Sequence, residues 1–243
     1  MSGPRRIYLF AGLFALAVAG CTDAGVQRAQ TSIGDTPRRP KLVLVDDLAF
    51  SPGFTVGDRD LDARLEKRFG GEISPETIKS LGAKRVNDEM VATVIVLLRA
   101  AGLNAQPGDR EENAPKGDTA VVAGQVHALD QGKGAPRKPA GFTASNVVAD
   151  MTVSQISGGA EKQLLAFTAQ AASGRRPDAA ITGTIANTAI TAVIGAKSSP
   201  DVDLSPDMQG AARGLGRAIA DKIVAYGAQQ GWQVKAVSAV SAE

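Results

Sequence analysis

The chain has 243 residues, and its composition argues against two broad classes of protein. Its 27 Lys plus Arg nearly balance 25 Asp plus Glu, and without residues 1–20, which hold Arg5 and Arg6 and no acid, both sums are 25. No basic excess of the kind that marks nucleic-acid binding remains. A single cysteine excludes an intrachain disulfide framework. The 223 residues that follow residue 20 can bury one substantial core.

The first twenty residues have the order of a secretory signal peptide. A short basic start is followed by Ile7 to Gly20, which carries no charge and ends in small residues. A transmembrane helix needs about twenty apolar residues, so this run is too short to favour a permanent span. We therefore predict a cleaved signal peptide over 1–20. Arg5-Arg6 also faintly resembles a twin-arginine signal, so both export routes stay open.

The only cysteine stands directly after this apolar run. Val18-Ala19-Gly20-Cys21 resembles the lipobox of bacterial lipoproteins. That resemblance implies cleavage between Gly20 and Cys21 and a diacylglyceryl group on the thiol, which anchors a protein stably without spanning the membrane. Thr22 in place of Asp implies the outer membrane, with the domain facing the periplasm. The alternative is an incidental Cys21 beside a signal peptide that is cleaved elsewhere.

The first predicted elements follow a polar stretch. Residues 21–40, rich in Gly, Ser, Thr and Gln, have no hydrophobic period and predict a flexible tether with an r.m.s. reach of about 24 Å. The apolar run at 41–50 predicts a buried strand. Residues 60–69 predict a short helix, because three apolar side chains recur on one side before two glycines.

The strongest helix signal lies at 75–101. Ser74 is a good N-cap, Pro75 suits the first helical position, and Gly102 is a natural C-terminal stop. Apolar residues recur through the segment at helical spacing. A short strand at 103–105 completes a β-α-β unit with a right-handed crossover.

The remaining elements are three strands and a second long helix. We predict strands at 119–129, 142–156 and 162–171, a helix at 207–229, a possible short strand at 232–237 and a disordered tail at 238–243. The fold class is α/β: one mixed sheet of about five strands with two long helices on one face, in the order β-α-β-β-β-α and an optional last strand. These elements form a single domain over 41–237.

Two further segments are candidate interaction surfaces. Residues 179–196, with Ile185 and Ile190, carry no charge; they either pack on the domain or form a surface for a partner or the membrane. Lys133, Arg137 and Lys138 lie in a loop of Gly and Pro. They are either ordinary solvated surface or contacts for anionic lipid heads, glycan or an acidic partner.

The search for chemistry finds no catalytic pattern. His127, the only histidine, is expected to be an ordinary strand residue that shares a side with Gln125. Adjacent Asp46 and Asp47 would point to opposite faces of a strand, which makes them a poor acid/base pair and better strand-end residues. We find no metal-ligand spacing and no phosphate-binding loop, and expect no metal and no cofactor besides the covalent lipid on Cys21.

Several motifs carry a family resemblance over about residues 41–233. They are "VDDL", "ARLEKRFGG", "LLRAAGLNA", "GQVHALDQG", "GFTAS" and the closing "GWQV". With them the chain resembles the bacterial lipoprotein family of domain of unknown function 4410, which implies an α/β domain in the cell envelope and no known activity.

From these observations we expect a membrane-anchored envelope lipoprotein that is a non-enzymatic binding or assembly module. Its expected partners are membrane lipid, through acylated Cys21, and an envelope protein, but no nucleic acid. Two alternatives remain: a component of an oligomeric secretion or pore complex, and an envelope hydrolase that uses carboxylates.

Overall fold

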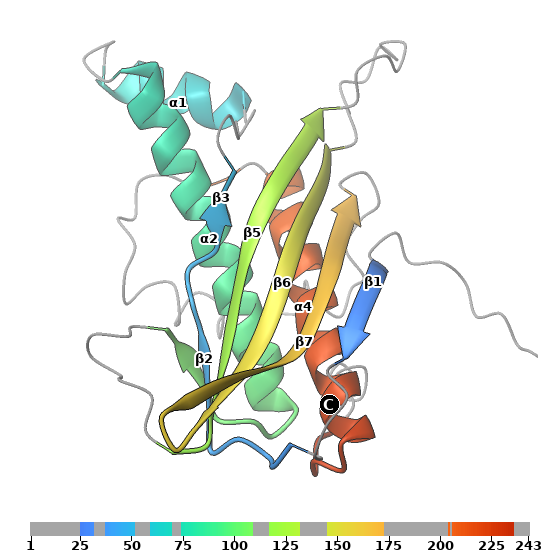
Figure 1. The fold of residues 1–243 in the computed structure, drawn as a ribbon. Helices are drawn as coiled ribbons and strands as arrows, with labels where there is room; N and C mark the ends of the chain where they lie inside the picture. The colour runs from blue at the N-terminus through green and yellow to red at the C-terminus, as the bar shows by residue number, and fades with distance from the viewer. Residues whose placement is uncertain are drawn as a thin grey trace, which may run out of the picture.

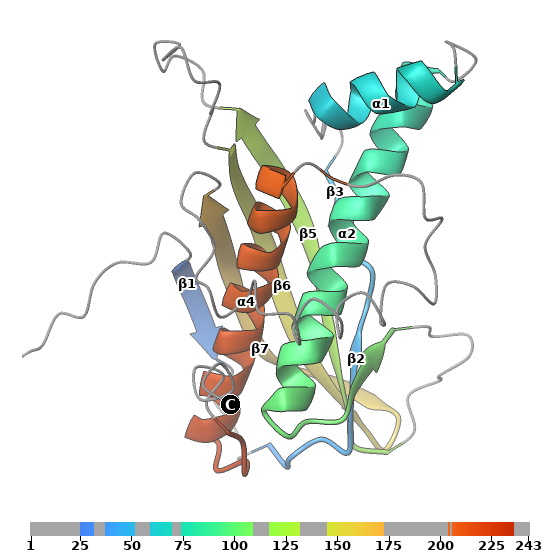
Figure 2. The same ribbon diagram turned by 180° about the vertical axis from the view of Figure 1, so that it is seen from behind.

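One mixed sheet carries two long helices on one of its faces (Figures 1 and 2). The computed structural model describes residues 25–31, 37–51, 59–69, 74–108, 117–131, 145–172, 204 and 206–235. The strands are β1 (Gly25–Thr31), β2 (Leu42–Val45), β3 (Ala49–Phe50), β4 (Ala105–Pro107), β5 (Thr119–Gln131), β6 (Ser145–Ser157) and β7 (Ala160–Ala172). The helices are α1 (Arg59–Phe69), α2 (Pro75–Ala100) and α4 (Pro206–Gln229).

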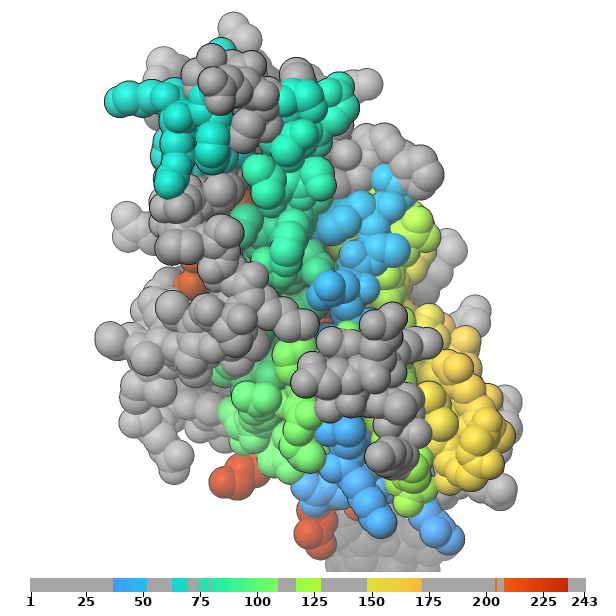
Figure 3. Space-filling view, turned by 90° about the vertical axis from the view of Figure 1, so that its left-hand side faces the viewer, coloured from blue at the N-terminus to red at the C-terminus, as the bar shows by residue number. Residues whose placement is uncertain are grey.

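The sheet order is β1-β7-β6-β5-β2-β4, and β3 pairs with β5 beyond the end of β2. The β1, β7, β6 and β5 strands alternate in direction, whereas β5, β2 and β4 are parallel. The α2 helix packs over the β2–β4 side and α4 over β6 and β7. In the space-filling view, α2 lies beside β2 and β3, with α1 at its beginning (Figure 3). The predicted α/β class and the two helices on one face are confirmed, although the described residues form a sheet of seven strands where about five were expected.

The core lies between the sheet and the helix pair. Alternate residues of the long antiparallel strands face the helices, among them Val122, Met151 and Phe167, while Ile95 and Leu215 approach from α2 and α4. Each such side chain, when fully buried, contributes about 1.5–3 kcal/mol. In the parallel strand β2 three consecutive residues, Val43 to Val45, are buried, as expected of a strand covered on both faces.

Both long helices end where the sequence predicts. Ser74 caps α2 by accepting the Thr77 N–H at 3.2 Å. At its other end Gly102 has φ 88°, and the Leu103 N–H donates to the Leu98 carbonyl at 2.9 Å. The same arrangement ends α4, where Gly231 has φ 77°. A residue with a Cβ is strained at this positive φ, which explains the glycine at both stops.

The two helices approach each other closely at Gly216. A Cβ placed there would lie 2.8 Å from the Met90 carbonyl oxygen and 2.8 Å from the Thr93 Cβ. The missing side chain therefore lets the α2 and α4 backbones come together over the sheet. At Gly214, two residues earlier in α4, a Cβ would meet only the Ala171 Cβ, at 3.6 Å.

The predicted flexible tether over residues 21–40 is wrong for residues 25–31, which form β1 at the edge of the sheet beside β7. Residues 37–40 are also held in place: the Pro37 carbonyl accepts the Trp232 indole N–H at 3.0 Å, and Arg39 donates to the Gly102 carbonyl at 2.6 Å. Backbone hydrogen bonding at a sheet edge needs no apolar period, so composition gave no sign of β1. The ordered chain therefore begins before residue 41.

Two strand predictions also need correction. The run at 41–50 is divided into β2 and β3, because residues 46–48 leave the strand at Asp46. Residues 232–235 form no strand. Instead, the buried Trp232 ring packs edge-on against the Tyr226 ring, with ring centroids 5.8 Å apart, and covers the backbone at Gly227. The tail at 238–243 lies outside the described residues.

Among the described residues, no helix has both the length and the apolar character needed to cross a membrane.

Candidate functional site

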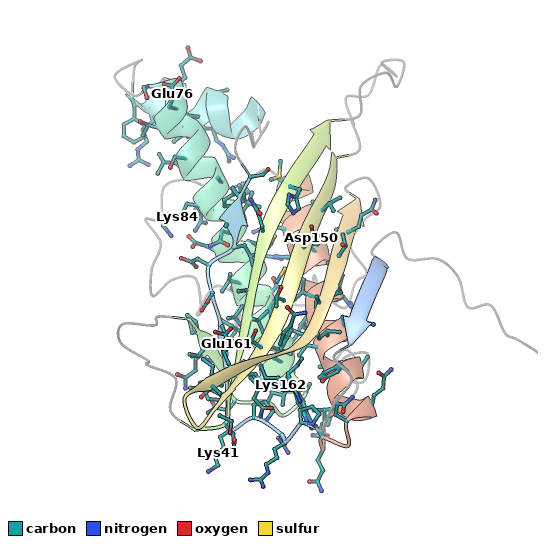
Figure 4. All side chains as sticks on the ribbon, in the orientation of Figure 1. Lys41, Glu76, Lys84, Asp150, Glu161 and Lys162 are labelled. Atoms are coloured by element: carbon teal, nitrogen blue, oxygen red, sulfur yellow. The ribbon has the colours of Figure 1, made fainter. Side chains whose placement is uncertain are left out.

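A row of polar side chains crosses the sheet face opposite the helices. Gln125 in β5 is paired with Asp150 in β6, which is paired with Thr168 in β7. These residues alternate with the core residues of their strands and so point to the helix-free side of the sheet. Figure 4 labels Asp150 on this side. The Thr168 hydroxyl donates to Asp150 Oδ1 at 2.6 Å, and His127 Nε2 lies 2.9 Å from Asp150 Oδ2. We call Gln125, His127, Asp150 and Thr168 the polar row.

His127, which contacts Asp150, is the extra residue of a β-bulge in β5. In the β5–β6 ladder Val126 pairs with Ala149 and Ala128 with Val148, which leaves His127 without a partner in the ladder. Ser51, just after β3, closes this bulge: its N–H donates to the Val126 carbonyl at 2.9 Å and its hydroxyl to the His127 carbonyl at 3.0 Å. The imidazole lies on the same face as Gln125, and at this bulge it is next to the Asp150 carboxylate.

The geometry of the polar row differs from that of a nucleophilic site. Nucleophilic catalysis needs a hydroxyl within hydrogen-bond reach of an imidazole nitrogen. Here the Thr168 hydroxyl donates to the carboxylate, and the same carboxylate holds His127 Nε2. The His127 and Asp150 side chains are 41% and 59% exposed, so their contact contributes only about 0–1 kcal/mol to stability. The polar row is therefore suited to hydrogen bonding with a partner.

A second polar cluster lies at the carboxyl ends of β2 and β4, where ligands often bind in open α/β sheets. Asn87 of α2 is buried; its Oδ1 accepts the Leu48 N–H at 2.8 Å and its Nδ2 donates to Asp47 Oδ1 at 3.0 Å. Gly108 packs against Asp46 so closely that a Cβ would lie 2.9 Å from the Asp46 Cα. Asn87 thus holds the loop after β2 in place, and this cluster is structural.

A buried ion pair joins the two long helices. Arg213 of α4 donates through Nε to Glu89 of α2, and their side chains are 10% and 4% exposed. The sequence analysis missed this pair, because the partners lie 124 positions apart and neither residue stands in a motif. Its only sign in the sequence is a charged residue next to inward-facing Met90. The two charges compensate each other within the helix layer, which makes this pair structural as well.

Two side chains of α4 have pKa values above their ordinary values. Burial raises the pKa of Asp221, although Arg217, with its Nε 3.7 Å away, acts in the opposite direction. Burial also raises the pKa of Tyr226. Neither group belongs to the polar row. In the part of the chain that the structure describes, no three His, Cys, Asp or Glu side chains come together as metal ligands would.

The candidate residues from the sequence divide into two sets. His127 and Gln125 share the polar row, and Asp47 has the loop-holding role expected after a strand. The signal cleavage site, the lipidation site and both candidate interaction surfaces lie outside the described residues: Gly20, Cys21, Lys133, Arg137, Lys138, Ile185 and Ile190.

Comparison with known proteins yields similar solved structures only. No protein-family model and no curated protein matches the chain. A variant dodecamer of PelC from Paraburkholderia phytofirmans is similar at 12% identity and a TM-score of 0.35, over 70% of this chain and 94% of that one. Another PelC dodecamer from the same organism has 13% identity and a TM-score of 0.34, over 71% and 93%. Similarity at this level carries no argument about function.

Proposed function

We propose that the protein is an envelope lipoprotein, anchored by a lipid on Cys21 in the outer membrane and facing the periplasm, that acts as a non-enzymatic binding or assembly module. The anchor is supported by the uncharged run that ends in Val18-Ala19-Gly20-Cys21 and by the absence of any other cysteine. The resemblance to the lipoprotein family of domain of unknown function 4410 supports the same location.

The observation that carries the binding role is the polar row. Three adjacent strands present an amide, an imidazole, a carboxylate and a hydroxyl on one sheet face, and the imidazole–carboxylate pair is largely exposed. Non-obligate protein interfaces are about as polar as the rest of a protein surface and use about one hydrogen bond per 100–200 Å². The polar row therefore fits an envelope protein partner better than the rival hydrolase, whose carboxylates would have to flank a scissile bond.

Two measurements test the proposal. Radiolabelled palmitate should enter the wild-type chain and not Cys21→Ser; labelling of both would refute the anchor. For the binding role, His127→Ala/Asp150→Ala should lose a partner that the wild type retains in pull-downs from detergent-solubilised envelope. The matched control is Lys84→Ala, which removes an ion pair of 2.9 Å to Asp88 on α2, away from the sheet face. Turnover of peptidoglycan by the purified protein would favour the hydrolase.

A second candidate is a component of an oligomeric secretion or pore complex. The observation that favours it is the absence of charge over residues 179–196. In that case Ile185→Asp and Ile190→Asp should lower the oligomer size in detergent without changing the urea midpoint. A lowered midpoint with an unchanged oligomer would show that the segment packs on its own domain.

A further inference from the structure

The chain between the proposed lipid and the sheet is very short. Only Thr22, Asp23 and Ala24 separate Cys21 from Gly25, the first residue of β1. A fully extended residue spans at most about 3.6 Å, so the Cα atoms of Cys21 and Gly25 are no more than about 14 Å apart. A lipid on Cys21 would hold the start of β1 within this distance of the bilayer surface.

The position of β1 in the fold decides which part of the domain this distance limit holds near the bilayer. The β1 strand is the edge strand beside β7, and Gly25 is paired with Gln170 near the end of β7. The start of β1 lies at the end of the sheet where β7 finishes, as Figures 1 and 2 show from both sides. We call Gly25 and Gln170 the β1 corner.

The sequence that connects β5 and β6 has a net positive charge. The last residue of β5, Gln131, pairs with the first residue of β6, Ser145, at the same end as the β1 corner. The 13 residues that connect them contain three basic residues and no acidic residue. Basic residues near a bilayer are attracted to anionic headgroups.

We infer that the β1 corner lies against the headgroups of the membrane, so that the domain has one fixed orientation and does not swing on a long tether. This inference rests on the proposed anchor at Cys21. Six register pairs hold β1 to β7, and the contacts of Pro37 and Arg39 fix the chain that follows. Only three residues therefore separate Cys21 from a strand that is held in the sheet.

The orientation places the opposite corner of the sheet far from the bilayer. Lys41 precedes β2, four strand positions from β1, which corresponds to about 19 Å at 4.8 Å per strand. Along the strands the next residue, Leu42, lies level with Glu161, nine residues from Gln170, or about 30 Å at 3.3 Å per residue. Lys41 is therefore about 35 Å from the β1 corner by these spacings. Figure 4 shows Lys41 and Glu161 at the end of the molecule away from Asp150.

The test uses the lipidated protein in vesicles of phosphatidylethanolamine and phosphatidylglycerol. Because the lipid occupies the only native thiol, an introduced cysteine is the only free one. Gln170→Cys and Lys41→Cys are each labelled with a fluorophore, and a headgroup-attached quencher is added to the vesicles. We expect the quenching at position 170 to exceed that at position 41 at least threefold; equal quenching, or more at 41, overturns the inference.

A linker variant provides the matched control. Twenty Gly and Ser residues inserted between Ala24 and Gly25 keep the lipid but add a reach of about 25 Å. The quenching at position 170 should then fall to that at position 41; an unchanged value would show that the short connection does not set the orientation. Failure of the anchor itself is separable, since palmitate would then label Cys21→Ser or leave the wild type unlabelled.

Discussion

The ion pair between Glu89 and Arg213 gives the sharpest stability prediction. Glu89→Leu removes the carboxylate and leaves a guanidinium whose side chain is 10% exposed. Removal of one partner from a buried pair costs about 3–5 kcal/mol, because the remaining charge stays desolvated. With a urea m-value of about 2 kcal/mol/M, the unfolding midpoint should fall by about 1.5–2.5 M. The assay is urea denaturation of the chain from residue 21, with Cys21→Ser to prevent lipidation.

The double variant Glu89→Leu/Arg213→Met tests whether the unpaired charge of Arg213 causes the loss of stability. It removes both charges at once, so its free energy of unfolding should return to within about 1 kcal/mol of wild type. The control on the same helix is Lys84→Met, which breaks an exposed pair with Asp88 and should cost less than about 0.5 kcal/mol. The reasoning is refuted if Glu89→Leu leaves the midpoint unchanged, or if the double variant is as unstable as the single one.

Two further predictions concern α4. Gly216→Ala places a Cβ 2.8 Å from the Met90 carbonyl oxygen, so it should lower the free energy of unfolding by about 1–3 kcal/mol in the same urea assay. Gly214→Ala has room for its Cβ and should raise the free energy of unfolding by up to about 1 kcal/mol. Equal effects of the two substitutions would contradict the close approach of the helices at Gly216. Asp221 has a pKa raised by burial, so its contribution to stability is fully present below the unfolded value of 3.8 and is lost as pH rises through the folded value. The stability of Asp221→Asn relative to wild type should therefore rise over that window and stay level at neutral pH. A relative stability that falls over the same window would contradict the direction of the shift.

The long helices and the sheet class could be predicted from the sequence because their signals are local. Ser74 and Pro75 begin α2, and Gly102 and Gly231 stop α2 and α4, through interactions within five residues of each helix end. Such contacts depend on nearby residue types alone. By contrast β1 depends on β7, more than one hundred residues away, and "GVQRAQT" has no apolar alternation by which to recognise it.

The polar row shows why a site built across strands is harder to predict. The Gly158-Gly159 turn pairs Ser157 with Ala160, and an unbroken ladder from that turn would place Phe167 opposite Asp150. A register shift between Val153 and Ser154 places Thr168 there instead. A second irregularity is the bulge at His127. Alternation with Gln125 puts the imidazole on this face, but no residue pattern in the sequence shows that His127 lacks a ladder partner.

The long-range contacts that hold the N-terminal segment in the fold affect the order in which the chain folds. Thr31 pairs with Leu165, and Pro37 is held by Trp232, 195 positions later in the chain. Contacts over such sequence distances carry a loop-closure cost that must be met before they contribute, so they form late. The pairing of β1 therefore waits for β7, and the contact of Pro37 waits for Trp232, which follows the last helix. If Cys21 carries the proposed lipid, the modifying enzyme would meet this cysteine before β1 has joined the sheet.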